Sequence, residues 1–216
     1  MIVLERGLSP NTVSAYMNDI AQAFRDIPGM PSPAPGDLSE WVTGLSLSGL
    51  APRTVRRKIS SVKALFRYML EEGELSEDPC RHLRGPKPGL DLPDHLTVSE
   101  AEKLLEAEPG DGPLGLRNRA LLELGYGSGL RESELTDLTV DRRDMEEGFV
   151  RPLGKGSRER IVPMGEPCMG WMGRYLSEGR PRLARKGSGR TVFLSKSGRR
   201  LSRMTIWSVV RRAALR

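Results

Sequence analysis

A glycine-rich stretch over residues 125–138, Gly-Tyr-Gly-Ser-Gly-Leu-Arg-Glu-Ser-Glu-Leu-Thr-Asp-Leu, limits the folds open to this chain more than any other feature. Ahead of it, apolar residues recur at helical spacing, namely Leu116, Ala120, Leu121 and Leu124. We expect a core-facing helix that the three glycines stop, because glycine readily adopts positive φ and punctuates helices. The leucines after the glycines predict a second, short helix with Arg131 at its start.

Arg131 is a candidate phosphate ligand. A fixed cation beside the free N–H groups of a helix start is the outline of a phosphate site. Glu134 lies three residues further on, where its carboxylate can steady the guanidinium. An isolated Gly-Leu-Arg more commonly marks a helix cap, a core leucine and a solvated arginine. A second element favours function: residues 150–163 predict two short strands around a Gly-Lys-Gly turn, with Lys155 at the tip.

Residues 127–135 and 154–163 together resemble the tyrosine recombinase (phage integrase) family, and within it the Xer group of chromosome-dimer-resolving recombinases. Residues 5–16 are similar to the start of the family's DNA-gripping domain, and residues 92–100 to the beginning of its catalytic domain. The resemblance therefore extends over nearly the whole chain. It implies a mainly α fold with a small β-sheet: an N-terminal helical core-binding (SAM-like) bundle, then the first part of an α+β catalytic domain.

The resemblance also implies a reaction, site-specific DNA recombination. A tyrosine cleaves DNA, leaving a 3′-phosphotyrosyl bond and a free 5′-hydroxyl, and the strand is then rejoined to a partner. Arg131 matches the family's first phosphate-binding arginine, Lys155 its hairpin general acid, and Glu134 its supporting acid. The chemistry uses no metal and no cofactor. The implied partner is double-stranded DNA, bound by a homo- or hetero-tetramer of full-length chains.

The chain departs from the family pattern after its last predicted helix. The family also uses a His-x-x-Arg pair, a further His or Trp and the nucleophilic tyrosine, and none of these motifs matches this sequence. Both histidines, His82 and His95, precede Arg131, and each tyrosine fits a helix or its end: Tyr16, Tyr68, Tyr126 and Tyr175. We therefore expect a C-terminally incomplete catalytic domain and an inactive 216-residue chain. The open alternatives are a non-catalytic accessory DNA-binding protein on the recombinase scaffold, and a degenerate remnant.

A basic helix is predicted from residue 52 to about 72. One face is apolar, and residues 53–67 contain six basic and no acidic side chains. Small residues among the cations let a helix approach a phosphate backbone, although charge runs also form solvated faces. With one residue of the hairpin, the predicted DNA contacts are Arg53, Arg56, Arg57, Lys58, Ser61, Lys63 and Arg158.

Charge distribution also indicates a polyanionic partner. The chain has a net charge of +6, but residues 151–216 alone carry 17 basic and three acidic side chains. We expect this segment and the 53–67 helix to hold the same duplex.

Domain boundaries are predicted at 1–84 for the helical bundle, 85–95 for a Pro-rich linker and 96–216 for the catalytic part. The first helix should run to about residue 27 with one apolar stripe, Val13, Tyr16, Ile20, Phe24 and Ile27. Further elements are predicted along the chain: a capping box at residues 97–100 that starts a helix, a helix over residues 169–176, a β-rich run over residues 191–194, and a last helix capped by Ser202. No membrane span or signal peptide is recognised, and the two distant cysteines indicate reduced thiols. These features predict a cytoplasmic protein.

Overall fold

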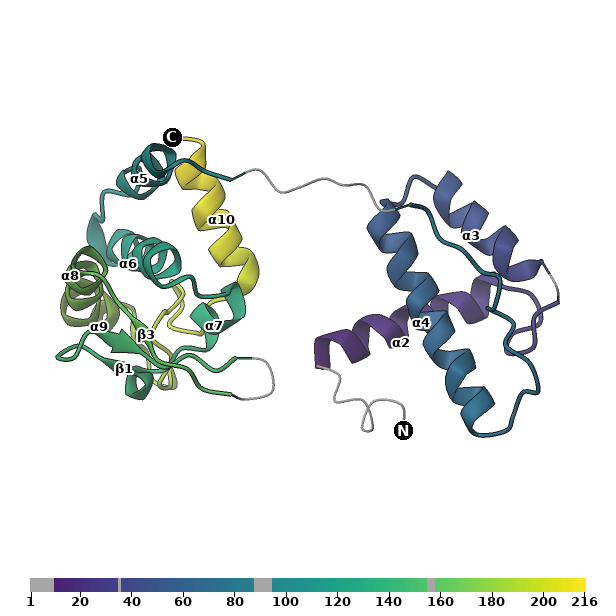
Figure 1. The fold of residues 1–216 in the computed structure, drawn as a ribbon. Coiled ribbons are helices and arrows are strands. Elements are labelled where there is room, and N and C mark those ends of the chain that lie inside the picture. Colours follow the sequence, from purple (N-terminus) through teal and green to yellow (C-terminus); the bar gives the residue numbers. More distant parts are fainter. Residues whose placement is uncertain (1–9, 35, 88–94, 155–157) are drawn as a thin grey trace. The chain divides into compact units, whose positions relative to one another are not determined.

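The computed structural model describes residues 10–34, 36–87, 95–154 and 158–216 (Figure 1). The chain divides into two compact units, Met1–Pro93 and Asp94–Arg216. Helices dominate both, and the described strands form one three-stranded antiparallel sheet in unit 2. The expected fold class, mainly α with a small sheet, is confirmed.

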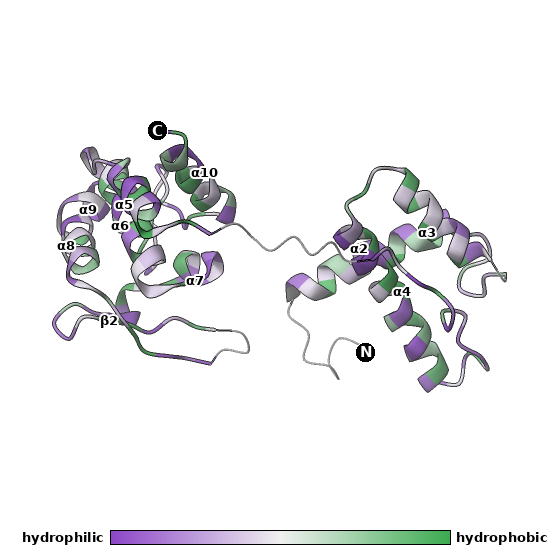
Figure 2. Ribbon diagram, turned by 45° about the horizontal axis from the view of Figure 1, so that its top comes forward, coloured by the Kyte–Doolittle hydropathy of each residue, from purple (hydrophilic) through white to green (hydrophobic). Residues whose placement is uncertain are grey.

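The described helices of unit 1 are α2 (Pro10–Asp26), α3 (Asp37–Leu47) and α4 (Pro52–Glu71). Pro52 at the first turn of α4 suits a helix start, because its missing N–H would have no intrahelical partner there. The helix α4 packs against both α2 and α3. Figure 2 shows hydrophobic and hydrophilic residues alternating around α4. Its apolar face supplies much of the core of unit 1, with Val55, Ile59, Val62, Phe66 and Met69.

The α2 helix has the predicted length but buries a different set of residues. Phe24, expected in the apolar stripe, is 46% exposed. The most buried positions are Asp19, Ala23 and Ile27. A carboxylate therefore lies inside unit 1, where burial is costly unless the charge is paired and hydrogen-bonded.

Unit 2 is built around α6 (Gly112–Ser128), which packs against α5 (Val98–Glu106), α7 (Glu132–Asp137) and a long irregular helical segment. That segment runs through α8 (Glu166–Arg174), a π-helical turn η3 (Tyr175–Gly179) and α9 (Arg180–Leu183). The sequence predicted only residues 169–176 of it as helix. The last helix, α10 (Arg203–Ala214), begins where predicted, with the Ser202 hydroxyl accepting the Thr205 N–H.

The glycine-rich stretch behaves differently from the prediction. The α6 helix continues through Gly125 and Gly127, and only Gly129 ends it, with φ of 57°. A residue in this left-handed conformation is the usual helix terminator, and glycine adopts it without steric cost. Gly125 and Gly127 are thus helical residues, and the prediction that they stop the helix is wrong. It is correct for Gly129.

The sheet has the order β1 (Arg143–Asp144), β2 (Phe149–Val150) and β3 (Val162–Pro163), preceded by a 3-10 turn η1 (Val140–Arg142). Val150 pairs with Val162, and a further bridge joins Leu153 to Glu159. The arms of the predicted hairpin are therefore present, and its tip at residues 155–157 lies outside the described residues.

The predicted β-rich run at residues 191–194 makes only isolated bridges, from Thr139 to Thr191 and from Leu194 to Arg200. Side chains, in place of a neighbouring strand, hydrogen-bond the backbone of this run. The Tyr175 hydroxyl donates to the Val192 carbonyl at 3.0 Å and accepts the Leu194 N–H at 3.1 Å. Arg117 donates to the Leu194 carbonyl at 3.1 Å. The Val192 carbonyl and both backbone groups of Leu194 thus have partners without a fourth strand.

Candidate functional site

Arg131 lies at the N-cap of α7, directly after the left-handed Gly129 and the buried Leu130. The chain turns at Gly129, and Leu130 is buried in the core. Together they fix the position of the Arg131 backbone. Its side chain is 74% exposed. The guanidinium donates from Nη1 to Glu134 Oε1 at 3.2 Å, as predicted. Its remaining N–H groups are left for a ligand such as a phosphate oxygen.

Glu134 is the buried acid of this site, with a side chain 2% exposed. Its carboxylate also accepts the Arg131 backbone N–H at 2.8 Å, which caps the start of α7. Two further hydrogen bonds come from Arg160, Nη1 to Oε1 at 2.6 Å and Nη2 to Oε2 at 2.8 Å. These bonds from Arg160, followed by those from Arg131, outweigh desolvation and lower the pKa of Glu134 to about 2.

Arg160 is a site residue that the sequence reasoning missed. It lies on the returning arm of the hairpin and joins that arm to α7 through Glu134. Glu159, on the same arm, forms an ion pair with Arg142 of the 3-10 turn η1, at 3.4 Å. Successive side chains of a strand point to opposite sides, so Glu159 and Arg160 lie on opposite sides of the arm. This alternation was the signal in the sequence for separate partners.

The structure brings together Arg131 and its supporting acid Glu134 but does not place the second predicted catalytic residue. Lys155 lies outside the described residues. Arg158, the predicted DNA contact on the hairpin, is exposed, and its carbonyl accepts the Gly154 N–H at 2.8 Å. The returning arm of the hairpin is thus joined to the Arg131 site through the hydrogen bonds of Arg160 with Glu134.

The predicted DNA-binding face of α4 needs correction at two positions. Lys58 is 8% exposed and Ser61 is fully buried. Lys58 Nζ donates to Asp19 Oδ1 at 3.1 Å, and Ser61 Oγ to Asp19 Oδ2 at 3.0 Å. Both side chains point into unit 1 because they satisfy the buried carboxylate, so neither is available to DNA.

Two other predicted contacts are partly engaged within unit 1. Arg57 forms an ion pair with Asp19, while its side chain stays 41% exposed. Lys63 Nζ donates to the Leu83 carbonyl at 2.9 Å. Arg53 and Arg56 are exposed as expected.

Two exposed residues on the same side of α4, Ser60 and Arg67, were missed. With the two arginines they lie at spacings of three, four and seven residues, which place all four on one side of the helix. We call Arg53, Arg56, Ser60 and Arg67 the α4 stripe. Within the described part of the chain, no acidic side chain pairs with its three arginines.

The tyrosines occupy varied surroundings. Tyr175 is fully buried, and burial raises the pKa of its hydroxyl. Tyr16 and Tyr68 are half-buried in unit 1, and Tyr126 near the end of α6 is 57% exposed.

Both cysteines are free and buried, Cys80 in unit 1 and Cys168 in unit 2, and burial raises the pKa of each thiol to about 12.

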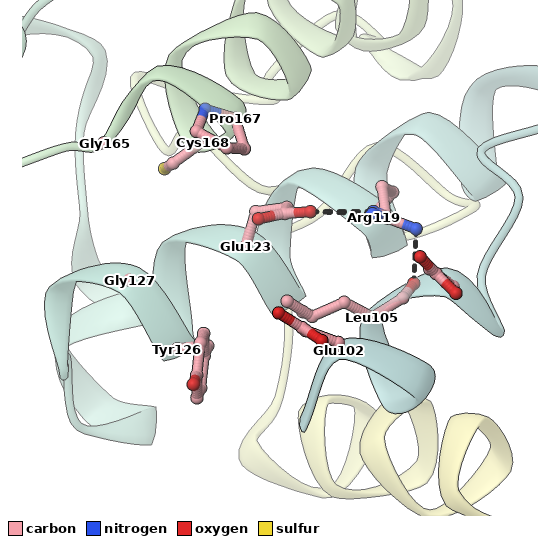
Figure 3. Close-up of a pocket in the computed structure, with 10 residues that line it drawn as sticks. Glu102, Leu105, Arg119, Glu123, Tyr126, Gly127, Gly165, Pro167 and Cys168 are labelled. Carbon is pink, nitrogen blue, oxygen red and sulfur yellow. Dashed lines mark hydrogen bonds and ion pairs between the residues drawn. The ribbon is translucent and has the colours of Figure 1, made fainter. Parts of the chain in front are cut away.

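A hollow of about 350 Å³ lies between α5, α6 and the start of α8 in unit 2 (Figure 3). Two of its polar side chains pair with each other: Arg119 donates to Glu123 Oε1 at 2.9 Å, and also to the Leu105 carbonyl. Tyr126 and Gly127 line it, but Arg131 does not. The hollow is thus separate from the predicted site residues.

Over the described ranges, no set of three or more His, Cys, Asp or Glu side chains is arranged to hold a metal ion. Nor does any described helix combine the length and apolar character of a membrane span.

The chain belongs to the phage integrase family. Residues 94–216 match that family, and residues 1–73 match the phage integrase N-terminal SAM-like domain.

Its relatives include proteins called tyrosine recombinase XerD. That of Listeria monocytogenes serotype 4b (strain F2365) is 35% identical, over 97% of this chain and 73% of the relative. That of Chlorobaculum tepidum is 37% identical, over 99% and 73%. The XerD of Mycobacterium tuberculosis (strain CDC 1551 / Oshkosh) is also 37% identical, over 100% and 75%. The chain therefore spans about three quarters of these relatives.

Solved structures share the fold at lower identity. A lambda integrase dimer bound to a COC′ core site superposes with a TM-score of 0.74 at 20% identity, over 99% of this chain and 77% of that one. The Tn1549 transposon integrase in complex with transposon right-end DNA gives 0.73 at 20%, over 93% and 71%. A lambda integrase tetramer bound to a Holliday junction gives 0.72 at 21%, over 99% and 60%.

Proposed function

We propose that this protein acts in site-specific recombination of double-stranded DNA, by strand cleavage and rejoining through a 3′-phosphotyrosyl intermediate. The observation that carries the proposal is the arrangement of Arg131, Glu134 and Arg160 in a chain of the phage integrase family. Arg131 and Arg160 both hydrogen-bond the buried carboxylate of Glu134. Arg131, the more exposed of the two, keeps N–H groups for a ligand. Such a group can meet the charge on the equatorial oxygens of a phosphodiester without being reorganised during the reaction.

In this proposal Arg131 contacts the scissile phosphate. Glu134 and Arg160 position Arg131 and the base of the hairpin and do not touch the reacting atoms. Lys155, the hairpin residue that matches the family's general acid, would protonate the leaving 5′-oxygen. No residue of the 216-residue sequence is assigned as the nucleophile.

The α4 stripe is proposed as a non-specific DNA contact in unit 1. Its arginines have no acidic partner among the described residues, and Ser60 adds a small hydroxyl between them. Contacts of this kind fix a protein on the phosphate backbone without reading sequence. Arg158 is proposed as a further backbone contact from unit 2. Assembly as a tetramer on DNA, as in the lambda integrase complex with a Holliday junction, belongs to the same proposal.

A second candidate is an accessory DNA-binding protein that uses this scaffold without chemistry. It is favoured by one observation, the exposed α4 stripe, because a contact with the phosphate backbone needs no catalytic residue. Both candidates require the chain to bind duplex DNA.

The first experiment therefore measures duplex affinity by fluorescence anisotropy over a range of salt concentrations. We expect Arg53→Ala/Arg56→Ala to bind all sequences more weakly and to reduce the slope of log K against log salt by about two, one unit per phosphate contact. A matched control, Arg25→Ala/Arg81→Ala, removes the same charge from exposed positions outside the stripe and should keep the slope. An equal loss in the two variants would show that net charge, and not the α4 stripe, governs binding.

A further inference from the structure

A polar cluster is buried between α2 and α4 of unit 1. Its centre is Asp19, which is 2% exposed. Three side chains of α4 donate to this one carboxylate: Arg57, Lys58 at 3.1 Å and Ser61 at 3.0 Å. Lys58 also donates to Gln22 Oε1 on α2. These hydrogen bonds tie α4 to α2.

This cluster fixes the rotation of α4 about its own axis. Lys58 and Ser61 are three residues apart and lie on the same side of the helix, and Arg57 reaches the carboxylate from the neighbouring position. Apolar contacts are non-directional, so the core of unit 1 alone would tolerate a small rotation of α4. Hydrogen bonds to two different oxygens of one carboxylate lose their geometry when the helix turns.

The cluster also sorts the six basic residues of α4 into two groups. Arg57, Lys58 and Lys63 have acceptors within unit 1. The other three belong to the α4 stripe and have no acidic partner in the described ranges. The inward group therefore determines the direction in which the outward group points.

We propose that Asp19 is a positioning residue for DNA binding: by holding Arg57, Lys58 and Ser61, it orients α4 so that the stripe faces the phosphate backbone. This inference rests on the proposed function, because it requires the stripe to contact DNA. Asp19 itself does not touch the duplex.

Charge and positioning predict opposite effects of Asp19→Asn, which makes the inference testable. Removing an acid close to a basic face raises the local positive potential, so charge alone would tighten binding to a polyanion. Loss of positioning weakens it. We expect duplex affinity to fall about tenfold, as for the loss of one or two good contacts. The control Glu40→Gln changes the charge equally at an exposed position of the same unit and should leave affinity equal or slightly higher.

Because Asp19→Asn leaves Lys58 buried without its anion, it also risks unfolding unit 1. Ser61→Ala is the second variant, since it removes one of the bonds to Asp19 without altering charge. Circular dichroism defines a temperature at which every variant is folded, and binding is measured there. We expect Ser61→Ala to bind about threefold more weakly. Unchanged affinity in Ser61→Ala together with unchanged or tighter binding in a folded Asp19→Asn would overturn the inference.

A double-mutant cycle separates positioning from general loosening. In the Arg53→Ala/Arg56→Ala background two of the three arginines that Asp19 orients are already gone. A positioning role predicts that Asp19→Asn then costs much less than in the parent chain, whereas a stability role alone predicts the same loss in both. If Arg53→Ala/Arg56→Ala itself has no effect, the proposed contact of α4 with DNA fails. If that variant weakens binding but Asp19→Asn does so equally in both backgrounds, only the inference about Asp19 fails.

Discussion

Glu134 and Arg160 are 26 residues apart in the sequence and share two hydrogen bonds, at 2.6 and 2.8 Å. Each guanidinium nitrogen meets a different carboxylate oxygen, which is the bidentate geometry that arginine favours. The pair joins α7, which begins after Arg131, to the returning arm of the hairpin. The pair therefore holds these two elements in a fixed position relative to each other.

Glu134→Gln should destabilise unit 2 by about 2 kcal/mol at pH 7, because hydrogen bonds to a charged group are lost and two arginines keep no anion. The pKa of Glu134 is lowered from 4.5 to about 2 in the folded chain. The stabilisation is thus fully present above about pH 4.5 and is lost as the pH falls toward 2.

Urea unfolding at several pH values tests this, with Trp171 and Trp207 as unit 2 probes in a Trp41→Phe background. The difference between the parent and Glu134→Gln should be constant from pH 7 to 5 and shrink at pH 3.5. A difference that persists unchanged at pH 3.5 would contradict the role of the ionised carboxylate.

Arg160→Lys should be almost as destabilising as Arg160→Ala, because an ammonium cannot reproduce the two parallel bonds. Arg158→Ala, on the same arm and exposed, is the control and should lie within about 0.5 kcal/mol of the parent. The same urea measurement applies. Full retention of stability by Arg160→Lys would show that charge alone, without the fork geometry, holds the hairpin.

Gly127 and Gly129 should respond to alanine with opposite signs. Gly129 has φ of 57°, a conformation that costs an L-residue about 1–2 kcal/mol, so Gly129→Ala should destabilise unit 2. Gly127 is helical and has no neighbour within 4 Å of an added Cβ, so Gly127→Ala should stabilise it by up to about 1 kcal/mol. Thermal unfolding of the two variants measures both effects. Equal shifts would mean that α6 does not end at Gly129.

The 216-residue chain should bind DNA without forming a covalent adduct. A nicked duplex that traps 3′-phosphotyrosyl species, followed by a denaturing gel, tests this. Tyr175 lies in the core and is engaged with Val192 and Leu194, so it cannot attack a phosphate. An adduct band would refute the expectation, and Tyr126→Phe would then show whether the exposed tyrosine of α6 is its source.

Local patterns in the sequence were enough for much of the fold. The period of apolar residues gave α4 and α6, because a helix face is set by residues three and four apart. Thr97 and Glu100 form the expected capping box at the start of α5, since both partners lie in one turn. The two hairpin arms and the contact between Arg131 and Glu134 are equally local. The family motifs also predicted Arg131 and Glu134 as site residues, and their role in the site stays a prediction.

What the sequence could not decide depends on partners far along the chain. Lys58 and Ser61 looked like exposed DNA contacts until Asp19, about forty residues earlier, proved to be the buried acceptor for both. Glycines 125 and 127 are helical because packing of α6 in the core outweighs their low helix propensity. Arg160 gained its role only through Glu134. Charge and periodicity fix which side chains are able to pair, whereas the tertiary structure decides which pairs form, because a buried charge selects its partner by proximity in space.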